Sequence, residues 1–398
     1  MRNTSAEQLA HTLLAHCLEG RPWPEHLLTD LLGCGGDREL FSIVVERLGD
    51  LFEPRLCNVY AELFSDVIAR KTGLHAGHLV SRYERVRQPR RLDRDPESVQ
   101  NIFVLSRVTL GADVAVTSVI LDAAKQRFPR AKIWFIGPKK NWELFAGDFR
   151  IQHLPIAYGR SGSIDDRLGI WPQLRDSVAR PHSIVIDPDS RLTQLGLLPI
   201  CPEEDYYFFE SRSYGSDSHN SLGELTGRWA EQTFGIIGPR AYVNPQFDAP
   251  EFAATVSFGV GENPAKRVTD PFEAEVLRRL PRPLLIDKGA GGEEAERVER
   301  AVAQAGGHGI SMWDGSFAGF AAHIWRSKLY VGYDSAGGHV AAAGSVPMIS
   351  VFAGEVSDRM YYRWRPHHRV NWRILRTQNA PVEQLLATFA EYLRQVSL

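Results

Sequence analysis

The strongest constraint on the fold is a repeated alternation of short apolar runs with longer amphipathic runs. Apolar runs of strand length lie at 102–105, 132–136 and 183–186, and a run with helical periodicity covers 114–128. Strands that alternate with helical runs are typical of α/β domains with a parallel sheet, because each parallel connection needs a crossover. The sequence therefore predicts an α/β domain over residues 100–245, Rossmann-like in its order of elements.

A second series of the same kind fills residues 246–398. Helical runs at 293–305 and 317–327 separate its strands. The strand-length runs lie at 254–258, 283–286, 309–313, 329–333 and 347–352. Two successive Rossmann-like domains are therefore expected, with the functional site in the cleft between them, because ligands of such sheets bind beyond the carboxyl ends of the strands.

The residues before these two domains have a different pattern. In residues 1–85 apolar residues recur at three- and four-residue steps, for example Leu9, Leu13 and Leu14, with no strand-like alternation. We expect an all-helical extension that docks against the first α/β domain or against a protein partner. Residues 86–99 are polar, hold several arginines and two prolines, and are typical of a linker.

Composition excludes several classes of protein. Lys+Arg at 46 against Asp+Glu at 48 gives a net charge of −2, which argues against a nucleic-acid partner. The four cysteines show no CxxC spacing, which argues against a zinc module or a disulfide scaffold and fits a reducing cytoplasm. The apolar runs are strand-sized and too short to span a bilayer, which needs about 18 residues.

The second domain carries the strongest functional signal, in six residues that follow the strand-length run 329–333. They are Asp334, Ser335, Ala336, Gly337, Gly338 and His339. Small residues let the backbone approach a ligand, and the free N–H groups of the following helix form a phosphate cradle. His339 adds a further donor.

A glycine-rich loop at 258–267 brings two cations, Lys266 and Arg267, to another strand end. The loop lacks the Gly-Lys-Ser/Thr ending of a P-loop, and Pro264 stands where a dinucleotide fingerprint needs its third glycine. If Lys266 faces the 334–339 segment, it would neutralise a diphosphate without a metal ion.

Three other strand ends offer carboxylates, each with a structural alternative. Asp113 begins a helix, where it is either a cap or a base that takes a proton from a substrate hydroxyl. Glu293 could bind a ribose or simply suit the positive end of a helix. Asp187 and Asp189 have the Asp-x-Asp spacing of a metal–diphosphate clamp, but the intervening Pro188 suits an ordinary turn and no third ligand accompanies them.

The stretch 359–369 interleaves arginines with aromatic residues. This composition is found in single-strand nucleic-acid platforms and in pockets for a phosphorylated sugar or nucleotide. Cation–π packing is the structural alternative. Because the chain as a whole is nearly neutral, we favour Arg363 and Arg365 as contacts to an anionic acceptor or to the nucleotide.

Together these motifs resemble the family 9 glycosyltransferases, the ADP-heptose:lipopolysaccharide heptosyltransferases and their relatives. The family's Gly-Asp pair after the first strand is matched by Gly111-Ala112-Asp113, with one residue inserted. Its loop ending in Lys-Arg is matched by 264–267, and its Asp-Ser/Thr-Gly-x-x-His-Leu-Ala-Ala-Ala motif by 334–343, where Ala336 replaces the glycine. The order and spacing of the three motifs carry the resemblance, which covers about residues 103–366.

The resemblance implies a GT-B fold and a metal-independent inverting transfer of a sugar, most often heptose from ADP-heptose, to a glycan or lipopolysaccharide-type acceptor. In this interpretation Asp113 is the general base, and Lys266 together with the helix start stabilises the leaving diphosphate. Residues 266–267, 334–339 and Glu293 would bind the donor, and no cofactor beyond the donor is implied. A lipid acceptor would place this cytoplasmic protein at the inner face of a membrane.

Two alternatives remain open at this point. The inserted Ala112 and the added helices favour a nucleotide-sugar-binding or assembly protein that has lost catalysis. A nicotinamide-dependent dehydrogenase is disfavoured by the incomplete glycine fingerprint.

Overall fold

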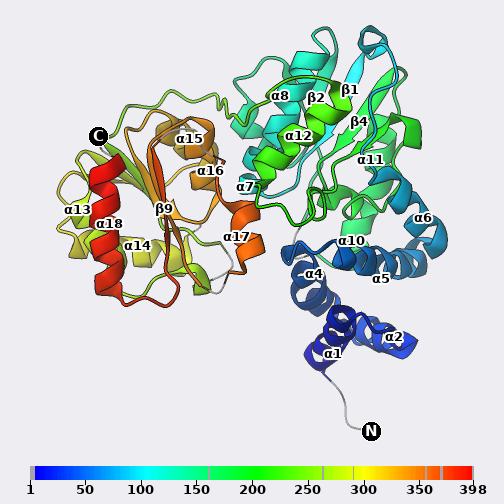
Figure 1. Cartoon of the computed structure of the whole chain (residues 1–398), viewed down its shortest axis with the longest axis horizontal. Coiled ribbons are helices and arrows are strands. Elements are labelled where there is room, and N and C mark those ends of the chain that lie inside the picture. Colours follow the sequence, from blue (N-terminus) through cyan, green and yellow to red (C-terminus); the bar gives the residue numbers. More distant parts are fainter. Residues whose placement is uncertain are drawn as a thin grey trace.

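The computed structural model describes residues 5–159, 162–261, 264–289, 291–354, 356–367 and 371–396. Figure 1 shows two halves built of sheet and helices, with helices from the N-terminal quarter, in blue, beneath the first half. The fold class expected from the sequence, two Rossmann-like domains with additional N-terminal helices, is confirmed.

The first sheet has five parallel strands in the order β3-β2-β1-β4-β5. The strands are β1 (Asn101–Leu105), β2 (Lys132–Gly137), β3 (Ile151–Pro155), β4 (Ser183–Asp187) and β5 (Tyr206–Phe208). Its helical segments are α7 (Leu110–Ala112), the π-helix η3 (Asp113–Thr117), α8 (Ser118–Arg127), α9 (Lys139–Trp142), α10 (Ile164–Gly169), α11 (Trp171–Val178) and α12 (Leu222–Phe234). The strand order reverses between β1 and β4.

The second sheet has six parallel strands in the order β11-β10-β9-β6-β7-β8 and reverses between β6 and β9. The strands are β6 (Ala254–Ser257), β7 (Leu284–Asp287), β8 (Ile310–Trp313), β9 (Tyr330–Tyr333), β10 (Met348–Phe352) and β11 (Trp372–Arg376). Its helices are α13 (Phe272–Arg279), α14 (Gly292–Gln304), α15 (Phe317–Trp325), α16 (Ala336–Ala343), α17 (Asp358–Trp364) and α18 (Val382–Val396). Short 3₁₀ turns occur at η2 (Pro96–Ser98), η4 (Glu143–Phe145), η5 (Arg191–Thr193), η6 (Glu203–Asp205) and η7 (Pro264–Lys266).

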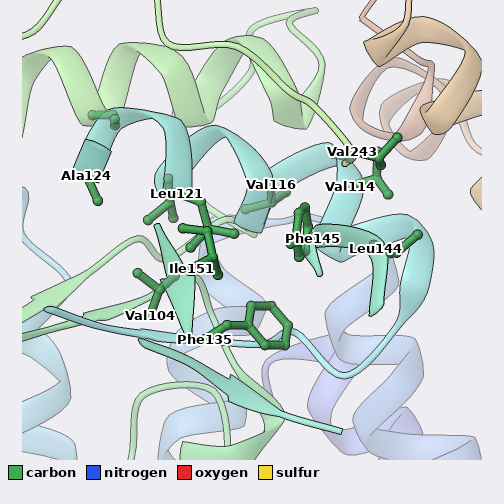
Figure 2. Packing of buried hydrophobic residues seen from close by; sticks show 14 of the residues in the cluster. Val104, Val114, Val116, Leu121, Ala124, Phe135, Leu144, Phe145, Ile151 and Val243 are labelled. Atoms are coloured by element: carbon green, nitrogen blue, oxygen red, sulfur yellow. The ribbon is translucent and has the colours of Figure 1, made fainter. Parts of the chain in front are cut away.

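Apolar residues cover both faces of the first sheet, as expected for parallel strands that are buried on each side. Val104 of β1 points into one cluster, and its neighbour Leu105 points into the other. Figure 2 shows the Val104 cluster, in which Phe135 of β2 lies near helical residues such as Leu121. Each such side chain stabilises the fold by about 1.5–3 kcal/mol when it leaves water.

The N-terminal helices form part of the first domain. They are α1 (Ala6–Glu19), α2 (Glu25–Gly33), α3 (Asp37–Glu39), the π-helix η1 (Leu40–Val45), α4 (Glu46–Asp50), α5 (Pro54–Thr72) and α6 (Ala76–Val86). Side chains of α5 and α6, among them Phe64 and Tyr83, share a buried cluster with Leu105 and Phe208 of the sheet. In Figure 1, α1 and α2 lie farthest from the sheets. The second half of the extension is therefore the helical layer on one face of the first sheet.

The two Rossmann-like domains touch where α16 meets the turn before η3. A Cβ atom at Gly111 would lie 3.3 Å from Cα of Ala336, so only glycine permits this approach without a shift. The helix α17, in orange in Figure 1, lies between the two halves. Its Arg359 donates to the carbonyl of Phe52 in the extension at 2.8 Å.

Candidate functional site

Each sheet has one point where the strand order reverses, and a crevice at that point is the usual binding position in such folds. In the second sheet the reversal lies between β6 and β9, where Val256 is paired with Val331. The loop with Lys266 follows β6, and the segment 334–339 follows β9. In the first sheet, β1 and β4 lead to Asp113 and to Asp187–Asp189 in the same way.

The second crevice brings together the two motifs that the sequence predicts to face each other. Lys266 Nζ donates to Oδ2 of Asp334 at 3.0 Å. The Lys266 side chain keeps 22% of its surface exposed, so the ammonium can still meet a ligand. Ser335 is the N-cap of α16 but makes no side-chain capping hydrogen bond. The N–H of Gly338 donates to the carbonyl of Ser335 at 3.2 Å, but among the described residues no side chain caps the N–H groups of Ala336 and Gly337. Together with Lys266 these two N–H groups form a cationic end to the crevice.

Gly337, Gly338 and His339 of that segment lie in the packed interior. Gly337 lies so close to Tyr330 that a Cβ there would come 2.2 Å from the tyrosine hydroxyl, which explains the small residue. Gly338 is buried as well. His339 is 7% exposed, 6.0 Å from the ring of Trp364 and in contact with Gly111 of the first domain. Burial lowers the pKa of His339, so its imidazole is neutral near pH 7.

Two further residues predicted to bind the donor differ in their surroundings. Arg267 donates through Nη2 and Nε to Oε1 of Glu273, at 3.0 and 3.1 Å, and so stabilises the interior of the second domain rather than facing the crevice. Glu293 is exposed on α14. Its neighbour Glu294 lies between the strand-end loops, where its carboxyl would be 2.9 Å from a Cβ at Gly259. Successive residues of a helix point in different directions, so the two glutamates have different surroundings. The sequence does not indicate which of them points inward.

Asp113, the predicted base, is enclosed by the first domain. Its side chain is 0% exposed. Four donors saturate the carboxylate, at 2.6–2.7 Å: the hydroxyls of Ser106 and Thr117, the side-chain amide of Asn141, and the backbone N–H of Arg107. Burial raises its pKa, and the four hydrogen bonds only partly oppose that rise. In this arrangement the carboxylate has no free lone pair and no solvent contact, so Asp113 stabilises the turn after β1, and it could act as the predicted base only if one of these donors left.

The local backbone explains this orientation. Asp113 begins the π-helix η3 directly after the short helix α7. A π-helical turn holds one residue more than an α-helical turn, so an inserted residue changes which side chains face inward. Ala112 is the residue inserted relative to the family motif, and it lies where α7 meets η3.

The two arginines predicted to bind the acceptor make hydrogen bonds that connect the two domains. Arg363 is 1% exposed and donates to the carbonyls of Ser216 and Asn220, at 2.5 and 3.1 Å. Arg365 donates to the carbonyl of His219 at 3.0 Å. Both side chains line a cavity of about 350 Å³, but their hydrogen bonds go to a loop of the first domain. Because the carbonyls of that loop leave no signature in the sequence, the pairing could not be foreseen.

The Asp-x-Asp pair is divided between two separate networks. Asp187 accepts from Thr193 at 2.5 Å and from Tyr206 at 2.6 Å, and burial raises its pKa to about 6. Asp189 accepts from Ser211 at 2.8 Å and from Arg212 at 3.2 Å. Within the described part of the chain, no group of three His, Cys, Asp or Glu side chains has the arrangement of a metal site.

A second cavity, of about 170 Å³, opens at the crevice of the first sheet. Arg107 and Asp189 line it from the strand ends, Tyr60 and Asp50 from the extension, and Trp364 from the second domain. The sequence did not single out Arg107, Arg212 or Asp50, because an isolated arginine or aspartate carries no sign of the cavity that it lines.

The fold class is that of the GT-B glycosyltransferases, with two Rossmann-like domains around a cleft. Among solved structures, the chain is similar to the E. coli heptosyltransferase WaaC with ADP, with 14% identity and a TM-score of 0.54 over 75% of this chain and 99% of that chain. It is also similar to a family 9 glycosyl transferase from Veillonella parvula, with 15% identity and a TM-score of 0.53 over 75% of this chain and 90% of that one.

These likenesses show a shared fold. No family model matches the chain, and no curated protein matches its sequence. A third similar structure is WaaC with ADP-2-deoxy-2-fluoro heptose, at 14% identity and a TM-score of 0.52 over 74% of this chain and 99% of that chain.

Among the described residues, no helix combines the length and apolar character that a membrane crossing requires.

Proposed function

We propose that the protein is a metal-independent, inverting glycosyltransferase that moves a sugar from a nucleotide diphosphate donor to a hydroxyl acceptor. One observation carries the proposal: Lys266, paired with Asp334, lies at the strand-order reversal beside the uncapped start of α16. A primary ammonium and free helix N–H groups suit a diphosphate at this position.

The same groups would assist the departure of the donor's diphosphate. As the acceptor oxygen attacks the anomeric carbon, the bond to the nucleoside diphosphate breaks and negative charge grows on the leaving oxygens. Fixed donors aimed at that charge lower the barrier, and the loss of one such donor typically costs about 2.7–4 kcal/mol. Lys266 and α16 would thus provide the charge stabilisation that other enzymes obtain from a divalent cation.

For the donor we propose ADP-heptose, and for the acceptor a glycan or lipopolysaccharide-type molecule. The support is the motif resemblance of residues 264–267 and 334–343, together with similarity in fold to structures described with ADP and with an ADP-heptose analogue. A lipid-linked acceptor would bring the protein to a membrane surface.

Calorimetric titration of ADP, UDP and GDP in the presence of EDTA tests the nucleotide site. We expect binding that survives EDTA, with ADP the tightest, and that falls sharply in Lys266→Ala. Lys328→Ala is the matched control, because that lysine is 71% exposed and pairs with Glu251. No binding of any nucleotide would overturn the proposal, and binding only with added divalent metal would overturn metal independence. Tighter UDP or GDP binding would overturn the ADP assignment alone.

The burial of Asp113 favours a second candidate, a nucleotide-sugar-binding or assembly protein without transfer activity. The two candidates differ in the fate of the donor. A catalyst consumes ADP-heptose and releases ADP, whereas a binding protein leaves the donor intact after long incubation.

A further inference from the structure

The last residues of α4 carry the N-terminal extension into the cleft between the two Rossmann-like domains. One wall of the 170 Å³ cavity at the first crevice is formed by residues of η1, α4 and α5. A larger cavity of about 510 Å³ lies on the other side of α4, between Arg47 and Leu51 of the extension and Phe352, Gly354 and Tyr361 of the second domain. The extension thus contributes to both halves of the cleft.

Among the described residues, Asp50 is the one side chain that lines both cavities. The larger cavity borders the loop that carries Lys266. A Cβ at Gly354, which lines this cavity, would lie 2.7 Å from the carbonyl oxygen of Ala265 and 3.7 Å from the backbone nitrogen of Lys266. Asp50 therefore stands between the crevice of the first sheet and the cationic end of the second.

The Asp50 carboxylate differs from that of Asp113 in both its exposure and its hydrogen bonding. Asp50 is exposed, and no hydrogen bond or ion pair from the described part of the chain engages its side chain. One turn earlier, Glu46 lies 3.6 Å from Arg191 and is partly neutralised by it. Asp50 thus has the free lone pairs and the access to a cleft that a proton acceptor needs.

The smaller cavity is also lined by a buried carboxylate, Asp189, that has one unpaired oxygen. Asp189 is 1% exposed and lines this cavity, yet its Oδ1 has no hydrogen-bond partner among the described residues. A buried carboxylate oxygen left unpaired is costly, at about 1–3 kcal/mol, unless a ligand or water supplies a donor. Hydroxyl groups of an acceptor are donors of this kind.

We propose that Asp50, from the N-terminal extension, is the general base of the transfer and that the 170 Å³ cavity holds the acceptor hydroxyl. This inference rests on the proposed glycosyltransferase function. The Asp50 carboxylate takes the hydroxyl proton, the acceptor oxygen forms its bond to the anomeric carbon, and the bond from that carbon to the nucleoside diphosphate breaks. The diphosphate leaves with the electron pair beside Lys266, and Asp50 then returns its proton to water.

The charged groups around Asp50 agree with this role. The cleft walls partly desolvate the side chain and raise its pKa, and Glu46 raises it further. Arg191, Lys266 and Arg47 oppose the rise without cancelling it. Activity should therefore increase as pH rises through the raised pKa of Asp50, because the base works only when deprotonated.

Release of ADP from ADP-heptose, with water as the acceptor, provides an assay that needs no knowledge of the natural acceptor. We expect Asp50→Asn to lower this rate by at least about 100-fold, with ADP affinity unchanged. Asp50→Glu should retain part of the rate and shift the acidic limb of its pH profile. Asp30→Asn is the matched control, an exposed carboxylate on α2, and should behave as the wild type.

Each outcome bears on the inference. A normal rate in Asp50→Asn would overturn it, and so would a rate abolished by Asp113→Asn in a variant whose thermal stability and ADP affinity match the wild type. A wild-type protein that binds ADP but never cleaves the donor would overturn the base while leaving nucleotide-sugar binding intact. Absence of ADP binding would instead remove the proposed function itself.

Discussion

Each of the two crevices of this molecule has an aspartate beyond the end of a parallel strand, and the two aspartates are in opposite chemical states. After β1, Asp113 is fully buried and receives four hydrogen bonds. After β9, Asp334 is partly exposed and holds a single lysine at 3.0 Å beside an uncapped helix. Both are aspartates that follow a parallel strand and precede a helix.

The difference teaches that a carboxylate at a strand end is functional only where its surroundings leave bonding capacity unused. At the first crevice, Ser106, Thr117 and Asn141 consume that capacity, and the turn gains rigidity. At the second, the N–H groups of Ala336 and Gly337 and the 22% exposed side chain of Lys266 remain available to a ligand. In the proposed mechanism the proton acceptor is therefore Asp50, whose carboxylate makes no hydrogen bond within the described part of the chain.

The largest expected effect is on stability, in Asp113→Ala. Removal of the carboxylate leaves four donors without an acceptor, and each unpaired buried donor costs about 1–3 kcal/mol. We expect the free energy of unfolding, measured with urea, to fall by about 4 kcal/mol or more. Asp334→Ala is the paired comparison and should lower it by less, because this carboxylate engages one lysine rather than four donors. Equal losses in the two variants would contradict the contrast between the crevices.

The next effect is the pH dependence contributed by Asp187. Its pKa of about 6 in the folded protein lies above the ordinary carboxyl value, so the folded state binds the proton more tightly than the unfolded state does. Its contribution to stability is present at low pH and is lost as pH rises through 6. The wild type should lose about 2–3 kcal/mol relative to Asp187→Asn between pH 4 and pH 7, measured by urea unfolding. A difference that does not change with pH would show that Asp187 titrates normally.

A smaller effect is expected on nucleotide binding in Asp334→Ala. Without its partner carboxylate, the Lys266 ammonium loses the contact that fixes its position, although its charge remains. We expect ADP affinity to fall by about tenfold, which is about 1.4 kcal/mol, in calorimetric titration. An affinity that rises would mean that Asp334 chiefly competes with the diphosphate for Lys266.

The smallest effect separates two neighbouring glutamates. Glu293 is exposed, so Glu293→Gln should leave ADP affinity within about twofold of the wild type, the size of an ordinary surface change. Glu294 lies against the glycine loops, and Glu294→Gln should be the more harmful of the two. The reverse order, measured in the same titration, would restore Glu293 as the ribose contact.

Much of the architecture could be predicted because parallel strands are buried on both faces and read as apolar runs. The strands at 101–105 and 330–333 lie within one residue of their predicted bounds. The edge strands β3, β5 and β11 were not predicted, since two of them are only partly buried and β5 has only three residues. The approach of Lys266 to Asp334 was predicted, because adjacent parallel strands deliver their carboxyl ends to one edge.

Patterns in the sequence were enough to predict the two parallel sheets and the helical extension, and they suggested that Lys266 could face the 334–339 segment. Which polar side chains already have hydrogen-bond partners follows from tertiary contacts. Asp113 meets Asn141, Arg267 meets Glu273, and Arg363 meets the loop at 216–220. Tertiary packing likewise brings Asp50 into the cleft from the extension. These roles depend on which donors and acceptors tertiary packing brings together. Hydrophobic periodicity does not predict such contacts, because it indicates which face of a helix or strand is buried and not which residues lie opposite that face.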